Sequence, residues 1–125
     1  KTQSAFKSVD IAIVASGTAT LEGLLCECPM VVTYKVSKLT AWLMRRRASP
    51  KFVSLPNIIS NESLVSELIQ ENARPDLLAN AVISMLQNSD QLASLRGRFR
   101  NIKSTLRMGS AKRSADVIQR FLNIE

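Results

Sequence analysis

The stretch that decides the fold is Asp10-Ile11-Ala12-Ile13-Val14-Ala15-Ser16-Gly17-Thr18-Ala19-Thr20-Leu21-Glu22. Its apolar run over residues 11–15 is typical of a buried strand, and this run stops at the Ser-Gly-Thr turn. Apolar residues at helical spacing follow immediately after the turn. A strand, a tight turn and a helix in this order predict one half of a βαβ unit.

The turn at Ser16, Gly17 and Thr18 has features that suit a phosphate group. It places free backbone N–H groups and two hydroxyls at the positive end of a helix. Glu22 follows Thr18 by four residues, one too many for a capping box, so its carboxylate is available to ribose hydroxyls. The turn is therefore a candidate site for a nucleoside diphosphate. The alternative is an ordinary capped turn, with Glu22 favoured only by the helix dipole.

A second buried strand is predicted at Met30–Tyr34, with a helix of about Ala19–Glu27 between the two strands. This order predicts a right-handed crossover and a parallel sheet. Two strands cannot fill a doubly wound domain, so we expect preceding strands, or another chain, to complete the sheet. The chain lacks a starting Met and enters within a helical pattern, which indicates a C-terminal fragment of a longer protein.

The remainder of the chain is predicted to be mostly helical. Pro56 predicts a turn or a short extended segment, because the residue before a proline avoids helical geometry. Asn61-Glu62-Ser63 is expected to cap a helix over Leu64–Glu71. Further helices are predicted at Lys38–Arg47, from Pro75 to about Leu86, at Gln91–Leu106 and at Ala111–Leu122. The predicted fold class is therefore α/β in the N-terminal part of the chain and helical in the C-terminal part.

Composition limits the function. The chain has 125 residues, of which 46% are hydrophobic, so it is a single domain at most and is not disordered. Its net charge of +7 favours an anionic partner, whether nucleic acid, anionic lipid or a phosphorylated substrate. Cys26 and Cys28 are too close for an ordinary disulfide, and we expect them to be free thiols. They also lack partners for zinc, because the chain has no His to complete a metal site, so we expect no metal.

Two further candidate sites have competing interpretations. Asn57, after Pro56, either hydrogen-bonds its own backbone or lines a ligand cleft. The basic segment with Lys38, Trp42, Arg45, Arg46 and Arg47 is either a solvated helix face or a helix that lies on a membrane surface.

Three stretches, taken with their order and spacing, resemble the lipid-A-disaccharide synthase family. They are Ala15–Glu22, Cys28–Tyr34 and Val53–Asn57, and the resemblance extends from about Asp10 to the end of the chain. The resemblance implies the C-terminal Rossmann-like half of a B-type glycosyltransferase from Gram-negative bacteria, with part of its parallel sheet missing here. Residues 1–60 would belong to the UDP-sugar domain. Residues 61–125 would be C-terminal helices that pack on it, or on the partner subunit of a homodimer.

The family transfers 2,3-diacylglucosamine from UDP-2,3-diacylglucosamine to 2,3-diacylglucosamine 1-phosphate. The products are lipid A disaccharide 1-phosphate and UDP, in lipid A and lipopolysaccharide biosynthesis. The resemblance therefore implies a cytoplasmic protein, peripheral on the anionic surface of the inner membrane.

Residue by residue, the resemblance assigns Ser16, Gly17 and Thr18 to the diphosphate, Glu22 to the ribose and Asn57 to the donor site. It implies no metal and no other cofactor. It places the catalytic base in an N-terminal domain that this sequence lacks. We therefore expect no catalytic residue in this chain, and no glycosyl transfer by the chain alone.

Two other functions compete with this interpretation. A basic nucleic-acid-binding module would explain the charge, but the aromatic platforms and the helix-turn-helix pattern of such modules are missing, so nucleic acid is not an expected partner. A UDP-sugar epimerase-like domain would share the Ser-Gly turn and the downstream Glu, but it would not need a basic apolar helix.

Overall fold

The computed structural model describes residues 2–47, 51–107 and 117–122. Residues 117–122 are helical. The elements before them are α1 (Thr2–Lys7), β1 (Ala12–Ala15), α2 (Thr18–Leu25), β2 (Met30–Tyr34), α3 (Lys38–Arg47), α4 (Leu55–Ser60), β3 (Ser66–Ile69), the 3₁₀-helix η1 (Gln70–Asn72), α5 (Pro75–Leu86) and α6 (Ser89–Arg107).

Three parallel strands form the sheet, in the order β1-β2-β3. In the register, Ala12 pairs with Met30, and Val31 pairs with Ser66. The central strand β2 begins with Met30, Val31 and Val32, all fully buried. Such a continuous apolar run is what a parallel strand covered on both faces requires.

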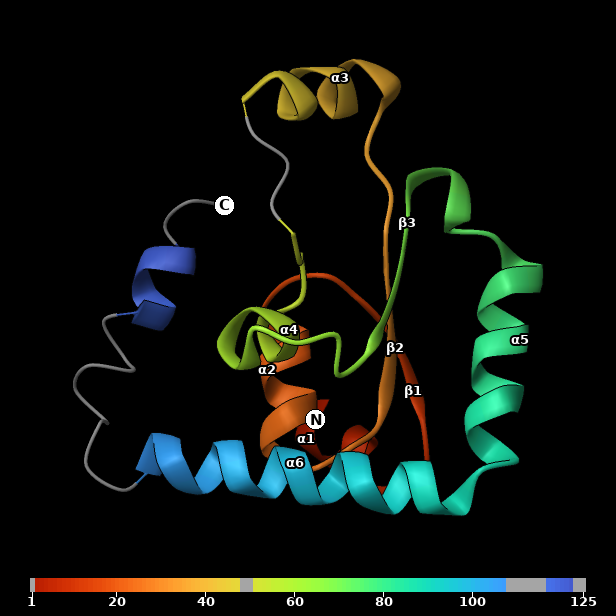
Figure 1. Cartoon of the computed structure of the whole chain (residues 1–125), viewed down its shortest axis with the longest axis vertical. Coiled ribbons are helices and arrows are strands. Elements are labelled where there is room, and N and C mark those ends of the chain that lie inside the picture. Colours follow the sequence, from red (N-terminus) through yellow and green to blue (C-terminus); the bar gives the residue numbers. More distant parts are fainter. Residues whose placement is uncertain (1, 48–50, 108–116, 123–125) are drawn as a thin grey trace.

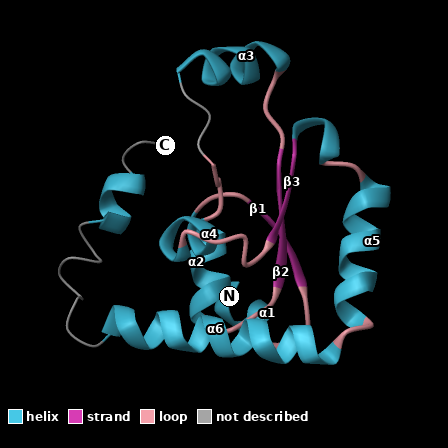
Figure 2. Cartoon of the chain, in the orientation of Figure 1, coloured by secondary structure: helices cyan, strands magenta, loops and turns pink. Residues whose placement is uncertain are grey.

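Helices surround the sheet on several sides (Figures 1 and 2). α5 packs against β2 and β3, whereas α2 packs against β1 and is joined there by α1 and α4. α6 runs past the amino ends of the strands and contacts both α2 and α5. α3 projects beyond their carboxyl ends (Figure 1). Different helices therefore lie at the two ends of the sheet, α6 at the amino ends of the strands and α3 beyond the carboxyl ends.

The core lies between the sheet, α2 and α6. Its largest fully buried side chains include Phe99 of α6, Leu24 of α2 and Met30 of β2. Gly23 faces this core, and a Cβ atom there would lie 2.5 Å from Cε of Met30 and 3.3 Å from the ring of Phe6. A glycine at this position therefore allows α2 to approach the buried strand closely.

The structure confirms much of the predicted fold. The first strand, the connecting helix, the second strand and their parallel pairing are all present, as are the basic helix and the two long helices α5 and α6. The fold is α/β, a partial Rossmann-like sheet followed by helices. Of the last predicted helix, residues 117–122 are helical, and residues 111–116 lie outside the described residues.

Two predictions were wrong. The helix expected over Leu64–Glu71 is instead β3 followed by η1, because pairing with β2 overrides the local helical spacing of apolar residues. The turn or short extended segment expected at Pro56 is instead the short helix α4, in which Pro56 lies in the first turn. A proline is tolerated there because a backbone N–H at that position would have no helical partner. β3 thus extends the sheet beyond residue 60.

Candidate functional site

The predicted phosphate turn lies where β1 ends and α2 begins. Gly17 is the N-cap of α2, with φ 142° and ψ −159°, and no side chain caps the helix. Glycine adopts this conformation readily, whereas a residue with a Cβ atom would be strained. Within the described residues no protein acceptor meets the backbone N–H groups of Thr18 and Ala19. The turn therefore presents donors at the positive end of a helix.

Ser16 is placed at the turn, but its hydrogen-bond donors are used within the chain. Its hydroxyl donates to the carbonyl oxygen of Val53 at 3.0 Å, and its backbone N–H donates to the carbonyl oxygen of Thr33 at 3.0 Å. The turn therefore offers one exposed hydroxyl, that of Thr18, rather than the two that the sequence predicted. A contact between Ser16 and a diphosphate stays a prediction.

Glu22 lies one helical turn beyond Thr18, at the spacing that places two residues on the same helix face. It is half-buried, and Thr18 is exposed. The arrangement thus combines a carboxylate with the free N–H groups at the start of the same helix. These groups suit a nucleoside diphosphate. The N–H groups can donate to its phosphates, and the carboxylate can accept hydrogen bonds from its ribose hydroxyls.

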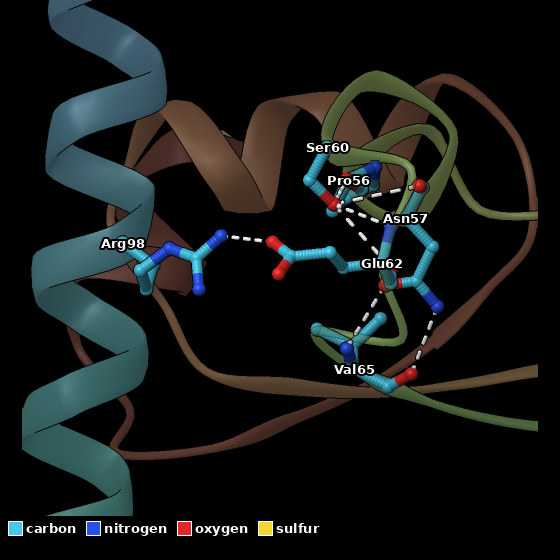
Figure 3. Close-up of polar contacts among 6 residues, drawn as sticks. All are labelled: Pro56, Asn57, Ser60, Glu62, Val65 and Arg98. Atoms are coloured by element: carbon cyan, nitrogen blue, oxygen red, sulfur yellow. Dashed lines mark hydrogen bonds and ion pairs between the residues drawn. The ribbon is translucent and has the colours of Figure 1, made fainter.

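Asn57 lies within α4 and is fully buried. Its side-chain amide donates to the carbonyl oxygen of Val65 at 2.9 Å and accepts from the N–H of Val65 at 3.0 Å. Figure 3 shows this pair of bonds, and beside it Ser60 and Glu62 at the end of α4, with Glu62 paired to Arg98 of α6. Asn57 therefore joins α4 to the segment that enters β3, and its place in the donor site stays a prediction.

Glu67, which the sequence did not single out, is also part of this region. Its carboxylate accepts hydrogen bonds from the backbone N–H groups of Val53 and Ser54, the Ser54 hydroxyl and the Asn57 amide. This carboxylate therefore holds the backbone of residues 53–54, which lead into α4, and the Asn57 side chain within α4. Only the pairing of β3 with β2 brings Glu67 to this position, so no local sequence signal indicated it.

The predicted membrane residues belong to α3, on the carboxyl side of the sheet (Figure 1). Leu39 is 67% exposed and Trp42 51% exposed, and Lys38 is exposed as well. Arg45, Arg46 and Arg47 fall in the last turn of α3, and their side chains lie outside the described residues. No helix in the described part of the chain is both long and apolar enough to cross a bilayer.

Two observations concern the side chains that could bind a metal or act as a nucleophile. In the residues that the structure describes, no three Cys, Asp or Glu side chains gather to hold a metal ion. Cys26 and Cys28 are free thiols. Burial raises the pKa of the Cys28 thiol, which disfavours the nucleophilic thiolate.

One ion-pair cluster lies between α2 and α6. Glu27, just after α2, meets Arg100 at 2.9 Å and Lys103 at 3.5 Å. Partial burial acts to raise the pKa of Glu27, but hydrogen bonds and charges from Arg100 and Lys103 outweigh it and lower that pKa below its ordinary value. This cluster binds the two helices together and has no part in the turn.

A parallel sheet with a glycine turn and an open helix N-terminus at its carboxyl edge defines an α/β domain of the Rossmann-like class. Comparison with protein families matches residues 1–121 to the family described as lipid-A-disaccharide synthetase. The chain belongs to this family.

Individual relatives agree. The chain is 39% identical over 118 residues to the lipid-A-disaccharide synthase of Yersinia pseudotuberculosis serotype I, which is 94% of this chain and 30% of that protein. It is 37% identical over 121 residues to the enzyme of Dechloromonas aromatica, covering 97% and 32% of the two chains. It is 42% identical over 122 residues to that of Thiobacillus denitrificans, covering 98% and 33%. The chain thus spans about a third of the length of these relatives.

Proposed function

We propose that this chain is the UDP-sugar-binding part of a lipid-A-disaccharide synthase. The observation that carries the proposal is the uncapped N-terminus of α2 in a chain of this family. This N-terminus follows β1, and Glu22 lies one helical turn further along α2. In open α/β sheets, ligands bind beyond the carboxyl ends of the strands, where this turn lies.

In this proposal the backbone N–H groups of Thr18 and Ala19, with the Thr18 hydroxyl, receive the diphosphate. Gly17 allows the phosphates to approach, since nothing lies within 4 Å of where its Cβ would be. Glu22 accepts the ribose hydroxyls. Ser16 contributes by holding the turn through Val53, and Asn57 contributes by holding α4 behind it.

The reaction would be the transfer of 2,3-diacylglucosamine from UDP-2,3-diacylglucosamine to 2,3-diacylglucosamine 1-phosphate. As the glycosidic bond to UDP breaks, negative charge develops on the leaving diphosphate. N–H groups already oriented at a helix N-terminus stabilise that charge without reorganising. Transfer also needs a base that deprotonates the acceptor hydroxyl and a surface that holds the acceptor near the donor. We assign both to the part of the family's proteins that this chain does not cover. The chain alone should therefore bind UDP without catalysing transfer.

We also propose that α3 lies on the anionic surface of the inner membrane, through Lys38, Trp42, Arg45, Arg46 and Arg47. Two observations support this. Leu39, Trp42 and Leu43 expose apolar area at the spacing of one helix face. Residues 35–51 contain six basic and no acidic residues, so the segment suits anionic lipid. α3 also lies on the same side of the sheet as the turn, which suits a diacylated donor.

The nucleotide assignment is tested by titrating UDP into the ¹⁵N-labelled chain. We expect the amide signals of residues 16–22 to shift with UDP and not with CMP, which lacks the second phosphate and carries cytosine in place of uracil. Glu22→Ala should weaken UDP binding by about tenfold, because two ribose hydroxyls lose a charged acceptor. Unmoved signals at 16–22, or unchanged affinity in Glu22→Ala, would overturn the assignment.

The membrane assignment is tested by sedimentation with phosphatidylglycerol vesicles. Replacing Arg45, Arg46 and Arg47 by Gln should weaken binding, at about 1 kcal/mol for each basic residue near the surface. A matched variant loses the same charge elsewhere, by Gln at Lys7, Arg107 and Arg120. An equal loss of vesicle binding in the two variants would show that α3 is a solvated helix face and not a membrane-binding helix.

A further inference from the structure

The Glu67 carboxylate has an unusually large number of partners for a half-buried side chain on a short strand. It accepts from the N–H of Val53 at 3.1 and 3.2 Å, from the N–H of Ser54 at 2.8 Å and from the Ser54 hydroxyl at 2.6 Å. The Asn57 amide adds a further bond at 2.9 Å. Glu67 thus fixes both the backbone of the 53–54 segment and the start of α4.

The same segment holds the candidate nucleotide turn from its other side. The Val53 carbonyl accepts the Ser16 hydroxyl at 3.0 Å. The N–H of Leu55 donates to the Thr20 hydroxyl at 3.4 Å, and that hydroxyl donates to the carbonyl of Gly17 at 2.7 Å. Two hydrogen-bonded links therefore run from the residues that Glu67 holds to the residues that form the turn.

We propose that Glu67 is a positioning residue of the nucleotide site, an inference that rests on the proposed function of the turn. It holds residues 53–55 where Ser16 and Thr20 can bond to them, and so fixes the direction of the N–H groups at the start of α2. A carboxylate that touched the diphosphate would repel it. Glu67 is suited to support the turn without touching the nucleotide, because its carboxylate oxygens already accept hydrogen bonds from four groups of the protein.

The burial of this segment explains why a carboxylate is needed. Ser54 and Asn57 are fully buried, so water cannot replace a lost acceptor. An amide at position 67 would turn an N–H₂ group toward donors, and at least one of those donors would be left without an acceptor. The 53–55 segment would then move, and with it the two links to the turn.

The test compares Glu67→Gln with Glu62→Gln. Glu62 is a matched control, because it is a carboxylate in the nearby connection between α4 and β3. It pairs with Arg98 of α6 and, within the described residues, forms no hydrogen bond to residues 53–55. For each chain we would record amide spectra without ligand and the Kd for UDP, at a temperature where the chain is fully folded.

We expect Glu67→Gln to shift the amide signals of residues 16–20 in the absence of ligand and to raise the Kd for UDP about tenfold. Glu62→Gln should do neither. A Glu67→Gln chain that loses thermal stability but keeps its signals at 16–20 and its affinity for UDP would overturn the positioning role and leave only a structural one.

Ser54→Ala keeps the test decisive if Glu67→Gln does not fold. It removes the shortest of the Glu67 bonds and leaves the carboxylate in place. We expect smaller shifts at residues 16–20 and a Kd raised about threefold, and no change in either would overturn the proposal. If the unaltered chain does not bind UDP at the turn, the proposed function itself fails. If it binds UDP and the variants bind equally well, only the positioning role fails.

Discussion

The two ends of the sheet differ in how their polar and apolar groups are satisfied. At the amino ends, α6 places Phe99, Leu95 and Leu92 in the core and pairs its basic side chains with Glu27 and Glu62. At the carboxyl ends, the N–H groups of the α2 turn are not capped, and α3 exposes apolar side chains. Stability is therefore concentrated at one end, and groups available for binding at the other.

This difference has a physical reason. Glycine takes the backbone conformation of the turn without strain, but its conformational freedom means that the surrounding structure must fix the direction of the turn. Gly17 is held between β1 and α2, and the 53–55 segment supports it through Ser16 and Thr20. The rest of the domain, packed around α6, supplies the stability that such an open turn does not.

The largest effect on this contrast should come from Phe99→Ala at the amino ends. Phe99 is fully buried, and its removal leaves a cavity that the helices cannot close, so we expect the free energy of unfolding to fall by about 3–5 kcal/mol. Urea unfolding measures the change. Leu86→Ala, on the exposed side of α5, should cost less than about 0.5 kcal/mol. Similar losses at both positions would contradict a core centred on α6.

A smaller effect should come from Gly17→Ala at the carboxyl ends. Space is available for a methyl group there, but φ is 142°, so the change introduces backbone strain of about 1–3 kcal/mol. We expect a modest loss of stability in urea and a larger relative loss of UDP affinity, because the turn must move to relieve the strain.

Gly97→Ala is the matched control for this change. Gly97 lies within α6, and nothing lies within 4 Å of where its Cβ atom would be. The same substitution there should raise stability by up to about 1 kcal/mol, since alanine is a better helix former than glycine. Loss of stability at both glycines would contradict the backbone argument at Gly17.

Local patterns predicted the parts of the fold that depend on neighbouring residues. The strand, turn and helix over residues 11–25, the second strand and the two long helices were identified because apolar spacing and turn residues act over a few positions. The turn at Ser16, Gly17 and Thr18, with Glu22 in the helix that follows, was predicted for the same reason. Whether they bind a nucleotide is a separate prediction that the fold alone does not test.

The parts that sequence could not predict depend on distant contacts. Leu64, Val65, Leu68 and Ile69 have a spacing that suits a helix, yet pairing with β2 makes a strand of residues 66–69. Ser16 is 37 residues from the Val53 carbonyl that takes its hydroxyl. The support that Glu67 gives to residues 53–57 follows from that strand, so it could not be seen until the strand was known.

The smallest effect should come from Glu27→Gln, which removes the charge between α2 and α6 and keeps the shape of the side chain. Because Arg100 and Lys103 lower the pKa of Glu27 in the folded chain, ionised Glu27 stabilises the fold at pH values above the ordinary pKa that it has in the unfolded chain. That contribution disappears as the pH falls through the lower folded value. Arg100 is largely exposed, so we expect a loss below about 1 kcal/mol at pH 7.

Urea unfolding of both chains at pH 7 and at pH 3 tests this prediction. The difference in free energy of unfolding should be smaller at pH 3 than at pH 7, because ionised Glu27 contributes less to stability as the pH falls below its ordinary pKa. It should also be smaller in 1 M salt, which screens the pair. Asp76→Asn is the control, because the side chains of Asp76 and Arg74 are both exposed and the two residues are close in sequence, so their ion pair does not join two helices. A difference between Glu27→Gln and the unaltered chain that stayed constant from pH 7 to pH 3 would show that charge at position 27 does not bind α2 to α6.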